Sequence, residues 1–164
     1  MKSYDVAVIG SGPGGYVAAI RCAQLGKSVA IIEKYNTMGG TCLNVGCIPS
    51  KALLDSSHHF EDAIKHFDIH GIELPGEVKV NLEKMMARKQ SVVDQTTVGI
   101  EFLMKKNNID VYHGVGAFKD ATHISISGDT PQEIEAKHTI IATGSKPSVL
   151  PFVSVDKERI ITST

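Results

Sequence analysis

Two of the three cysteines in this 164-residue chain, Cys42 and Cys47, lie in the segment GGTCLNVGCIPSK with four residues between them. In a regular α-helix this spacing gives about 7.5 Å of rise and about 140° of rotation. A disulfide requires Cα atoms within about 7 Å and converging Cβ vectors. The pair can therefore close only where the backbone leaves the regular helix, and the neighbouring glycines and Pro49 favour such a departure. The segment predicts a redox-active dithiol.

A zinc site and a pair of inert buried thiols are the alternatives for these two cysteines. Structural zinc sites usually combine two pairs of closely spaced ligands, and the sequence offers one such pair. The third cysteine, Cys22, lies in an alanine-rich helical pattern typical of a small buried side chain. Among the histidines, His58 and His59 are adjacent and so point to different faces of a helix. We therefore expect no metal site.

A glycine-rich turn follows the first predicted strand, residues 4–9, whose continuous β-branched run is typical of a strand buried on both faces. Gly10 permits the tight turn, Gly12 lets the backbone approach a pyrophosphate, and Gly15 allows close packing of helix on strand. A second strand ends at Glu33, where a carboxylate would hold the hydroxyls of an adenosine ribose. This βαβ unit predicts a dinucleotide site, and the alternative is a glycine turn without a ligand.

The composition is that of an ordinary globular domain, with 42% hydrophobic and 21% charged residues and a net charge of −1. Neither nucleic acid nor a membrane is an expected partner, because the charge is nearly balanced and no apolar run approaches roughly 20 residues. The N-terminus enters a strand-like run directly, so we expect no signal peptide and a cytoplasmic location.

The remaining pattern predicts a helical hairpin inserted into an α/β sheet, followed by a small antiparallel meander. The first helix follows the cysteines and ends near Phe67, and the second covers about residues 81–106. The predicted strands that follow are 109–112, 116–118, 123–127, 133–136 and 139–142, the last of them parallel.

Four motifs carry a resemblance to a known family: YDVAVIGSGPGGY, IIEK, GGTCLNVGCIPSKALL and TIIATGS, spaced along residues 4–145. They resemble the lipoamide branch of the pyridine nucleotide–disulfide oxidoreductases, the dihydrolipoamide dehydrogenases, over the N-terminal third of those proteins. The resemblance implies an incomplete Rossmann-like FAD-binding domain with a parallel sheet, helical hairpin and β-meander. Residues 1–164 would be its N-terminal part, with the NAD-binding and dimer-interface domains absent.

The resemblance also implies residue roles. Cys42 would be the interchange thiol, Cys47 the charge-transfer thiol against the flavin ring, and Lys51 would lie near the reactive flavin nitrogen. The residues expected to contact FAD are Gly10, Gly12, Pro13, Gly14, Gly15, Glu33, Lys34, Gly40, Thr41, Cys42, Lys51, Gly116, Thr143, Gly144 and Ser145.

The implied reaction is oxidation of dihydrolipoamide by NAD⁺ through a Cys42–Cys47 disulfide and FAD. The implied partners are the lipoyl domain of 2-oxo acid dehydrogenase or glycine cleavage complexes, and a second copy in a full-length homodimer. The isolated chain is expected to be inactive, because the family's His–Glu base lies in the interface domain. The alternatives are a fragment of a mercuric or glutathione-type reductase and a non-catalytic nucleotide-binding fragment.

Overall fold

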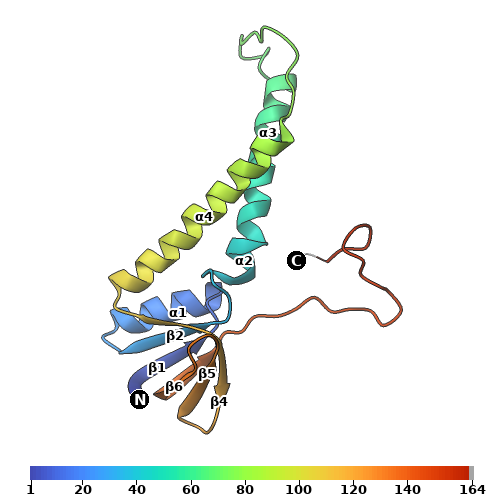
Figure 1. Cartoon of the computed structure of the whole chain (residues 1–164). Helices are drawn as coiled ribbons and strands as arrows, with labels where there is room; N and C mark the ends of the chain where they lie inside the picture. Colours follow the sequence, from blue (N-terminus) through green and yellow to red (C-terminus); the bar gives the residue numbers. More distant parts are fainter. Residues whose placement is uncertain (163–164) are drawn as a thin grey trace.

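The computed structural model describes residues 1–162 and consists of a six-stranded sheet, helices on one of its faces and a long helical hairpin standing away from it (Figure 1). After the last strand, residues 142–162 leave the sheet as an extended segment. The elements are β1 (Lys2–Ile9), α1 (Pro13–Gln24), β2 (Val29–Glu33), α2 (Gly40–Asn44), α3 (Cys47–Lys65), α4 (Leu82–Lys106), β3 (Asp110–His113), β4 (Val115–Phe118), β5 (His123–Ser127) and β6 (Gln132–Ile141).

The sheet has the order β3-β2-β1-β6-β5-β4. Strands β3, β2, β1 and β6 run parallel, and β5 is antiparallel to both β6 and β4. The predicted α/β class, with its parallel sheet, hairpin and meander, is confirmed.

One prediction about the strands was wrong. Residues 133–136 and 139–142 were expected to be separate strands, but 133–136 and 139–141 both belong to β6, which ends at Ile141. The strand is continuous because β1 pairs along nearly its whole length, from Lys2 opposite Ile134 to Ile9 opposite Ile141. The exposed residues Lys137 and His138 interrupt the apolar pattern without ending the hydrogen-bond ladder.

Two apolar clusters lie on opposite faces of the sheet. The upper cluster joins Val8 and Ile31 of the central strands to α1 and to the lower end of α4, represented by Ile100 and Met104. The lower cluster joins alternate residues of the same strands to the meander, which folds beneath the sheet. This arrangement explains the strand pattern, because β1 and β2 are covered on both faces.

The hairpin of α3 and α4 is buried only where it meets the sheet. Ala52 is the buried residue of α3, whereas Ile64 near its far end is 53% exposed and Leu82 at the start of α4 is 65% exposed. Asn81 caps α4 by accepting a hydrogen bond from the Lys84 backbone N–H at 2.9 Å. No helix within residues 1–162 combines the length and apolarity that crossing a membrane requires.

A carboxylate near the start of β1 ties three strands together. Asp5 accepts hydrogen bonds from Lys137 Nζ at 2.8 Å and from the Ser28 N–H and hydroxyl at 3.0 Å each. These bonds, that of Lys137 first, hold the pKa of Asp5 well below its ordinary value of 3.8. We therefore expect Asp5→Asn to lower the unfolding midpoint at pH 7.

The difference should depend on pH in one direction. Because the pKa of Asp5 is lower in the folded chain than in the unfolded chain, about 3.9, its contribution is complete well above pH 4 and is lost as the pH falls below that value. Urea unfolding from pH 7 down to pH 2 checks this, with the exposed turn residue Asp129 changed to Asn as control. A gap between wild type and Asp5→Asn that widens in acid would contradict the account.

Candidate functional site

The candidate site lies at the carboxyl ends of β1, β2 and β6, where ligands bind in open α/β sheets. Gly10 makes the turn out of β1 with a φ of +100°, and its N–H donates to Ile32 O at 2.8 Å. A Cβ on Gly10 would lie 2.4 Å from the Ala142 carbonyl oxygen, so only glycine fits. This contact places the exposed residues 143–145 beside the glycine turn.

Two glycines of the turn border open space. A Cβ added to Gly12 or Gly14 would meet nothing within 4 Å, whereas one on Gly15 would lie 1.9 Å from Gly10 O. Gly15 is therefore required by packing, and Gly12 and Gly14 leave room above the start of α1. Helix α1 begins with Pro13 and has no acidic residue in its first turn. Its free N–H groups and positive dipole end suit a phosphate, so the turn fits a dinucleotide.

A buried serine connects the glycine turn to the rest of the site. Ser11 is fully buried, and its N–H and hydroxyl both donate to Glu33 Oε2, at 2.8 and 2.6 Å. The same hydroxyl accepts from the Gly39 N–H at 3.1 Å. Glu33 Oε1 accepts from the Tyr35 N–H at 3.0 Å. Sequence reasoning missed Ser11, although a small polar residue inside a glycine-rich turn was the available signal.

Glu33 is itself buried, and its carboxylate binds backbone N–H groups of the protein. An ionised carboxylate has about four lone-pair sites, of which three are used by Ser11 and Tyr35. Capacity for a further donor therefore remains on Oε1.

The cysteine segment packs against the glycine turn. Gly39 and Gly40 have φ values of +101° and +60°, and a Cβ on Gly40 would lie 2.7 Å from Gly12 Cα. Asn44 fastens the same loop, because its Nδ2 donates to Met38 O at 3.1 Å and to Gly40 O at 2.9 Å. Two backbone segments thus approach each other where side chains would keep them apart.

The helix is interrupted between the two cysteines, as the spacing requires. Cys42 lies in the short helix α2, which ends at Asn44, and Cys47 is the first residue of α3. Gly46 forms the junction, where a Cβ would lie 2.9 Å from Thr41 O. The interruption brings the two thiols close enough for Cys47 to affect the pKa of Cys42.

The two thiols differ in environment. Both are free, with Cys42 half-buried and Cys47 exposed. The hydrogen bond with Cys47 raises the pKa of Cys42, burial raises that pKa further, and the nearby charge of Lys51 opposes the shift. Cys47 occupies the first position of a 19-residue helix. Cys42 is therefore suited to keep its proton.

The other predicted residues fall into two groups. Thr41, Lys51 and Lys34 are exposed on the site's side of the sheet, and Lys34 Nζ lies 4.7 Å above the Tyr35 ring. Gly116 lies in β4, where a Cβ would be 3.3 Å from Ile32 Cδ1, so a larger side chain would require Ile32 to shift by a few tenths of an ångström.

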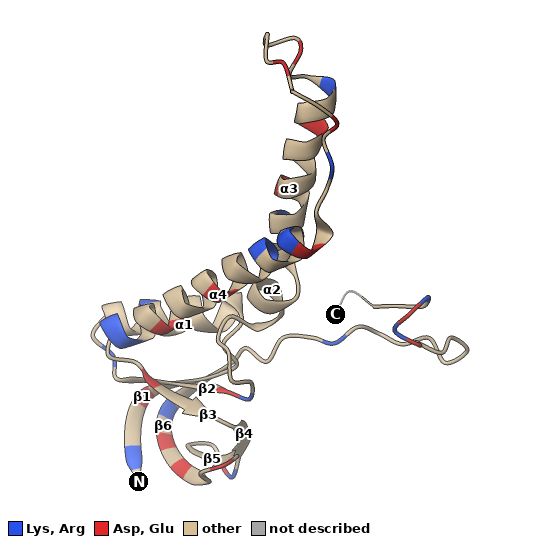
Figure 2. Ribbon diagram, turned by 45° about the horizontal axis from the view of Figure 1, so that its top comes forward, with Lys and Arg blue, Asp and Glu red and all other residues tan. Residues whose placement is uncertain are grey.

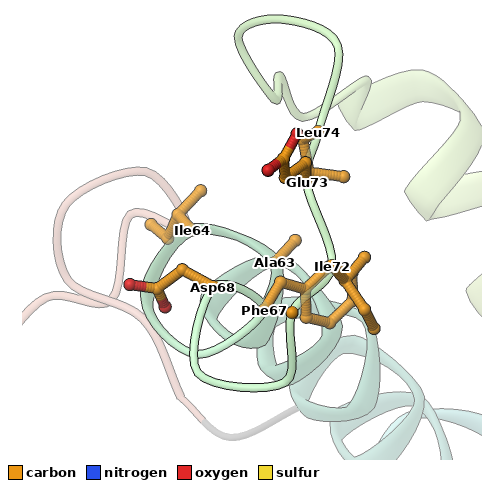
Figure 3. Close-up of a pocket in the computed structure, with 8 residues that line it drawn as sticks. Ala63, Ile64, Phe67, Asp68, Ile72, Glu73 and Leu74 are labelled. Atoms are coloured by element: carbon orange, nitrogen blue, oxygen red, sulfur yellow. The ribbon is translucent and has the colours of Figure 1, made fainter.

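No three His, Cys, Asp or Glu side chains within residues 1–162 are arranged to hold a metal ion. A hollow of about 620 Å³ lies at residues 63–74. Figure 3 shows Ile64, Phe67 and Ile72 around it. It lies at the tip of the hairpin, at the opposite end of α3 from Cys47 (Figure 1), and is not part of the site.

The fold and the site together define a class: a dinucleotide-binding α/β domain with a redox-capable dithiol beside its glycine turn. Comparison with known proteins agrees. The family described as pyridine nucleotide-disulphide oxidoreductase matches residues 4–164, and the chain belongs to this family.

Curated relatives match almost the whole chain. A dihydrolipoyl (dihydrolipoamide) dehydrogenase of Trypanosoma brucei brucei is 47% identical over 163 residues, which cover 98% of this chain and 34% of that protein. The mitochondrial dihydrolipoyl dehydrogenase of Schizosaccharomyces pombe is 50% identical over 164 residues, covering 98% and 32%. The chain therefore spans about a third of the length of these relatives.

A solved structure supports the same assignment. The Cu(II) complex of the HOCl-induced flavoprotein disulfide reductase RclA from Escherichia coli matches with a TM-score of 0.75 and 29% identity, over 94% of this chain and 32% of that one. The family and its dihydrolipoyl dehydrogenase members use FAD and NAD. The predicted family and its cofactors are thus confirmed.

Ser11 provides a test of how the site is held together. Ser11→Ala removes a buried donor to Glu33 and the side-chain acceptor of the Gly39 N–H. We expect a loss of about 1–3 kcal/mol in the free energy of unfolding, because buried polar groups would lose their partners. Urea denaturation checks this against Ser57→Ala on the exposed face of α3, which should change stability by less than about 0.5 kcal/mol. Equal effects would contradict the connecting role of Ser11.

Proposed function

We propose that this chain is the FAD-binding and redox-dithiol part of a dihydrolipoamide dehydrogenase. The observation that carries the proposal is the proximity of Cys42 and Cys47 on a segment that packs directly against the glycine turn. The identity of 47% and 50% to two dihydrolipoyl dehydrogenases supports the choice of substrate.

The residues around the turn fit FAD. Gly10, Gly12, Pro13, Gly14 and Gly15 would take the pyrophosphate at the start of α1. Glu33 and Lys34 would face the adenosine ribose, with Gly116 and residues 143–145 approaching the adenosine half by backbone. Gly40, Thr41 and Lys51 would line the path to the flavin ring. When bound, FAD accepts an electron pair from the reduced dithiol and transfers it to NAD⁺ as hydride.

The chemistry of the chain itself is thiol–disulfide exchange, starting from the oxidised Cys42–Cys47 pair. A substrate thiolate attacks Cys42 Sγ, which forms a mixed disulfide and releases Cys47 as a thiolate. The second substrate thiol loses its proton and attacks the substrate sulfur of the mixed disulfide, which releases Cys42 and leaves lipoamide as a disulfide. The cysteine pair has then gained two electrons.

The environments of the two sulfurs suit these roles. The raised pKa of Cys42 lets its thiol keep a proton once it has been released and donate it toward Cys47. The position of Cys47 at the start of α3 stabilises a thiolate there, and its exposed sulfur leaves room for a ring. Lys51, one turn further along α3, supplies a positive charge to the same region.

The complete reaction is proposed for the longer protein. Its further partners would be the lipoyl domain of a 2-oxo acid dehydrogenase or glycine cleavage complex and a second copy of the enzyme. A cytoplasmic location stays a prediction, and some relatives are mitochondrial by name.

The roles of the cysteines can be tested in the longer protein. Cys42→Ser and Cys47→Ser should each abolish NAD⁺ reduction by dihydrolipoamide, because exchange needs both sulfurs, while FAD stays bound. Steady-state kinetics and the flavin content of the purified variants are the measurements, with Cys22→Ser as the control that retains turnover. Turnover in either active-site variant would reject these roles, and preferred reduction of glutathione disulfide by the wild type would favour a glutathione-type reductase.

Gly12 separates cofactor binding from folding. Its φ of −63° is allowed for any residue and a Cβ would meet no protein atom within 4 Å, so Gly12→Ala should fold with an unchanged Tm. The methyl group would occupy space proposed for the pyrophosphate and weaken FAD binding by about tenfold or more, equivalent to about 1.4 kcal/mol.

Flavin fluorescence titration measures this effect, and Gly15→Ala serves as the contrast that damages the fold itself. Wild-type FAD affinity in a folded Gly12→Ala variant would contradict the proposed pyrophosphate position.

The proposal also predicts that residues 1–164 alone do not catalyse the reaction, because the general base and the NAD-binding domain would lie elsewhere in the protein. An NAD⁺ reduction assay with dihydrolipoamide and added FAD should show no turnover. Sustained turnover would place the whole active site within these residues and contradict the division of the enzyme proposed here.

A further inference from the structure

One arginine makes the polar connection between the two helices of the hairpin. Arg88 of α4 donates from one guanidinium nitrogen to Ala52 O at 2.9 Å and to Ser56 Oγ at 3.0 Å. Its other terminal nitrogen donates to Asp55 Oδ2 at 2.6 Å. Within residues 1–162 these are the only hydrogen bonds between α3 and α4. Figure 2 shows that charged residues lie along both helices. Among those within residues 1–162, Arg88 is the one that forms hydrogen bonds from α4 to α3.

The part of α3 that Arg88 contacts is close in sequence to the reactive residues. Ala52 directly follows Lys51 and lies five residues after Cys47. Ala52 is also the buried residue of α3, and Ile48 near the start of this helix is only partly buried against the upper core. The helix is interrupted at Gly46, before Cys47. Because α2 and α3 are separate helices, α2 does not fix the start of α3 as a continuous helix would.

Helix α4, in contrast, is anchored. Val93, Thr97, Ile100 and Met104 are buried, and the last two belong to the upper core of the sheet. Arg88 therefore connects α4 to a helix with fewer buried residues, about one turn beyond Cys47 and next to Lys51.

We propose that Arg88 is a positioning residue for the Cys42–Cys47 pair. By binding Ala52 O and Asp55 it fixes the first turns of α3 and keeps the Cys47 sulfur within reach of Cys42. The inference rests on the proposed function of the two cysteines as a redox pair.

The consequence concerns the equilibrium between dithiol and disulfide. In a glutathione buffer, the oxidised pair and two glutathione molecules exchange to give the two protein thiols and glutathione disulfide, with two electrons and two protons transferred. Closing the protein disulfide is favoured when its thiols are held close together. Releasing α3 should therefore make the protein disulfide easier to reduce.

The effect should be local. The side chains of Arg88 and Asp55 are 47% and 52% exposed, and exposed ion pairs contribute little to global stability. A change in the redox equilibrium without a matching change in Tm would thus distinguish positioning from general stabilisation.

The test measures the redox equilibrium of the pair in the full-length protein against glutathione, by alkylation and peptide mapping. Arg88→Met should shift the equilibrium toward the dithiol by about threefold to tenfold, where tenfold corresponds to about 30 mV. Asp55→Asn should shift it in the same direction by less, because the bond to Ala52 O remains. Arg88→Lys should lie between wild type and Arg88→Met, since an ammonium group lacks the planar fork.

Two further comparisons make the result decisive. Lys84→Met removes one positive charge from the same helix and should leave the equilibrium unchanged. Arg88→Met and Asp55→Asn change the charge in opposite senses, so a purely electrostatic influence would shift the equilibrium in opposite directions.

Two results would overturn the positioning role while leaving the redox pair intact. One is a shift of the redox equilibrium in opposite directions in Arg88→Met and Asp55→Asn. The other is a redox equilibrium of Arg88→Met equal to that of Lys84→Met. If Arg88→Met does not fold, Asp55→Asn and Arg88→Lys decide between the same outcomes. A wild-type protein that forms no Cys42–Cys47 disulfide would overturn the proposed function itself.

Discussion

The buried hydrogen bonds between Ser11 and Glu33 are the interaction on which the site depends. A carboxylate inside a protein is stable only when hydrogen-bond donors replace the lost water, and Glu33 obtains these donors from the glycine turn and from the chain after β2. Ser11 in turn accepts from the start of the cysteine loop. The glycine turn, the end of β2 and the dithiol loop are therefore one connected unit.

Close approaches between backbone segments also hold this unit together. Gly10 against Ala142, Gly15 against Gly10 and Gly40 against Gly12 each leave no room for a Cβ. The glycines of the motif thus differ in role. Gly10 and Gly15 are required by packing, whereas Gly12 and Gly14 border open space and are available to a ligand. The chain matches about a third of the length of its longer relatives.

The sequence was sufficient to predict the βαβ unit, the hairpin and the dithiol, because each depends on local pattern: continuous β-branched runs, helical periodicity, and a spacing that a regular helix cannot close. The continuity of β6 could not be predicted, since it depends on pairing with β1 across more than a hundred residues. The burial of Ser11 has the same origin, because its partners Glu33 and Gly39 meet only in the folded chain. The exposure of Ile64 and Leu82 arises because the hairpin extends beyond the sheet that would cover its apolar residues.

The central claim is that the dithiol and the flavin site form one redox centre, with Cys47 as the sulfur next to the flavin. Anaerobic visible spectroscopy of the FAD-loaded full-length protein, titrated with a dithiol, tests it most directly. The account predicts a long-wavelength thiolate-to-flavin absorption band that is present in the wild type and in Cys42→Ser and absent in Cys47→Ser. Bound flavin without such a band in the wild type, or a band that persists in Cys47→Ser, would contradict the account.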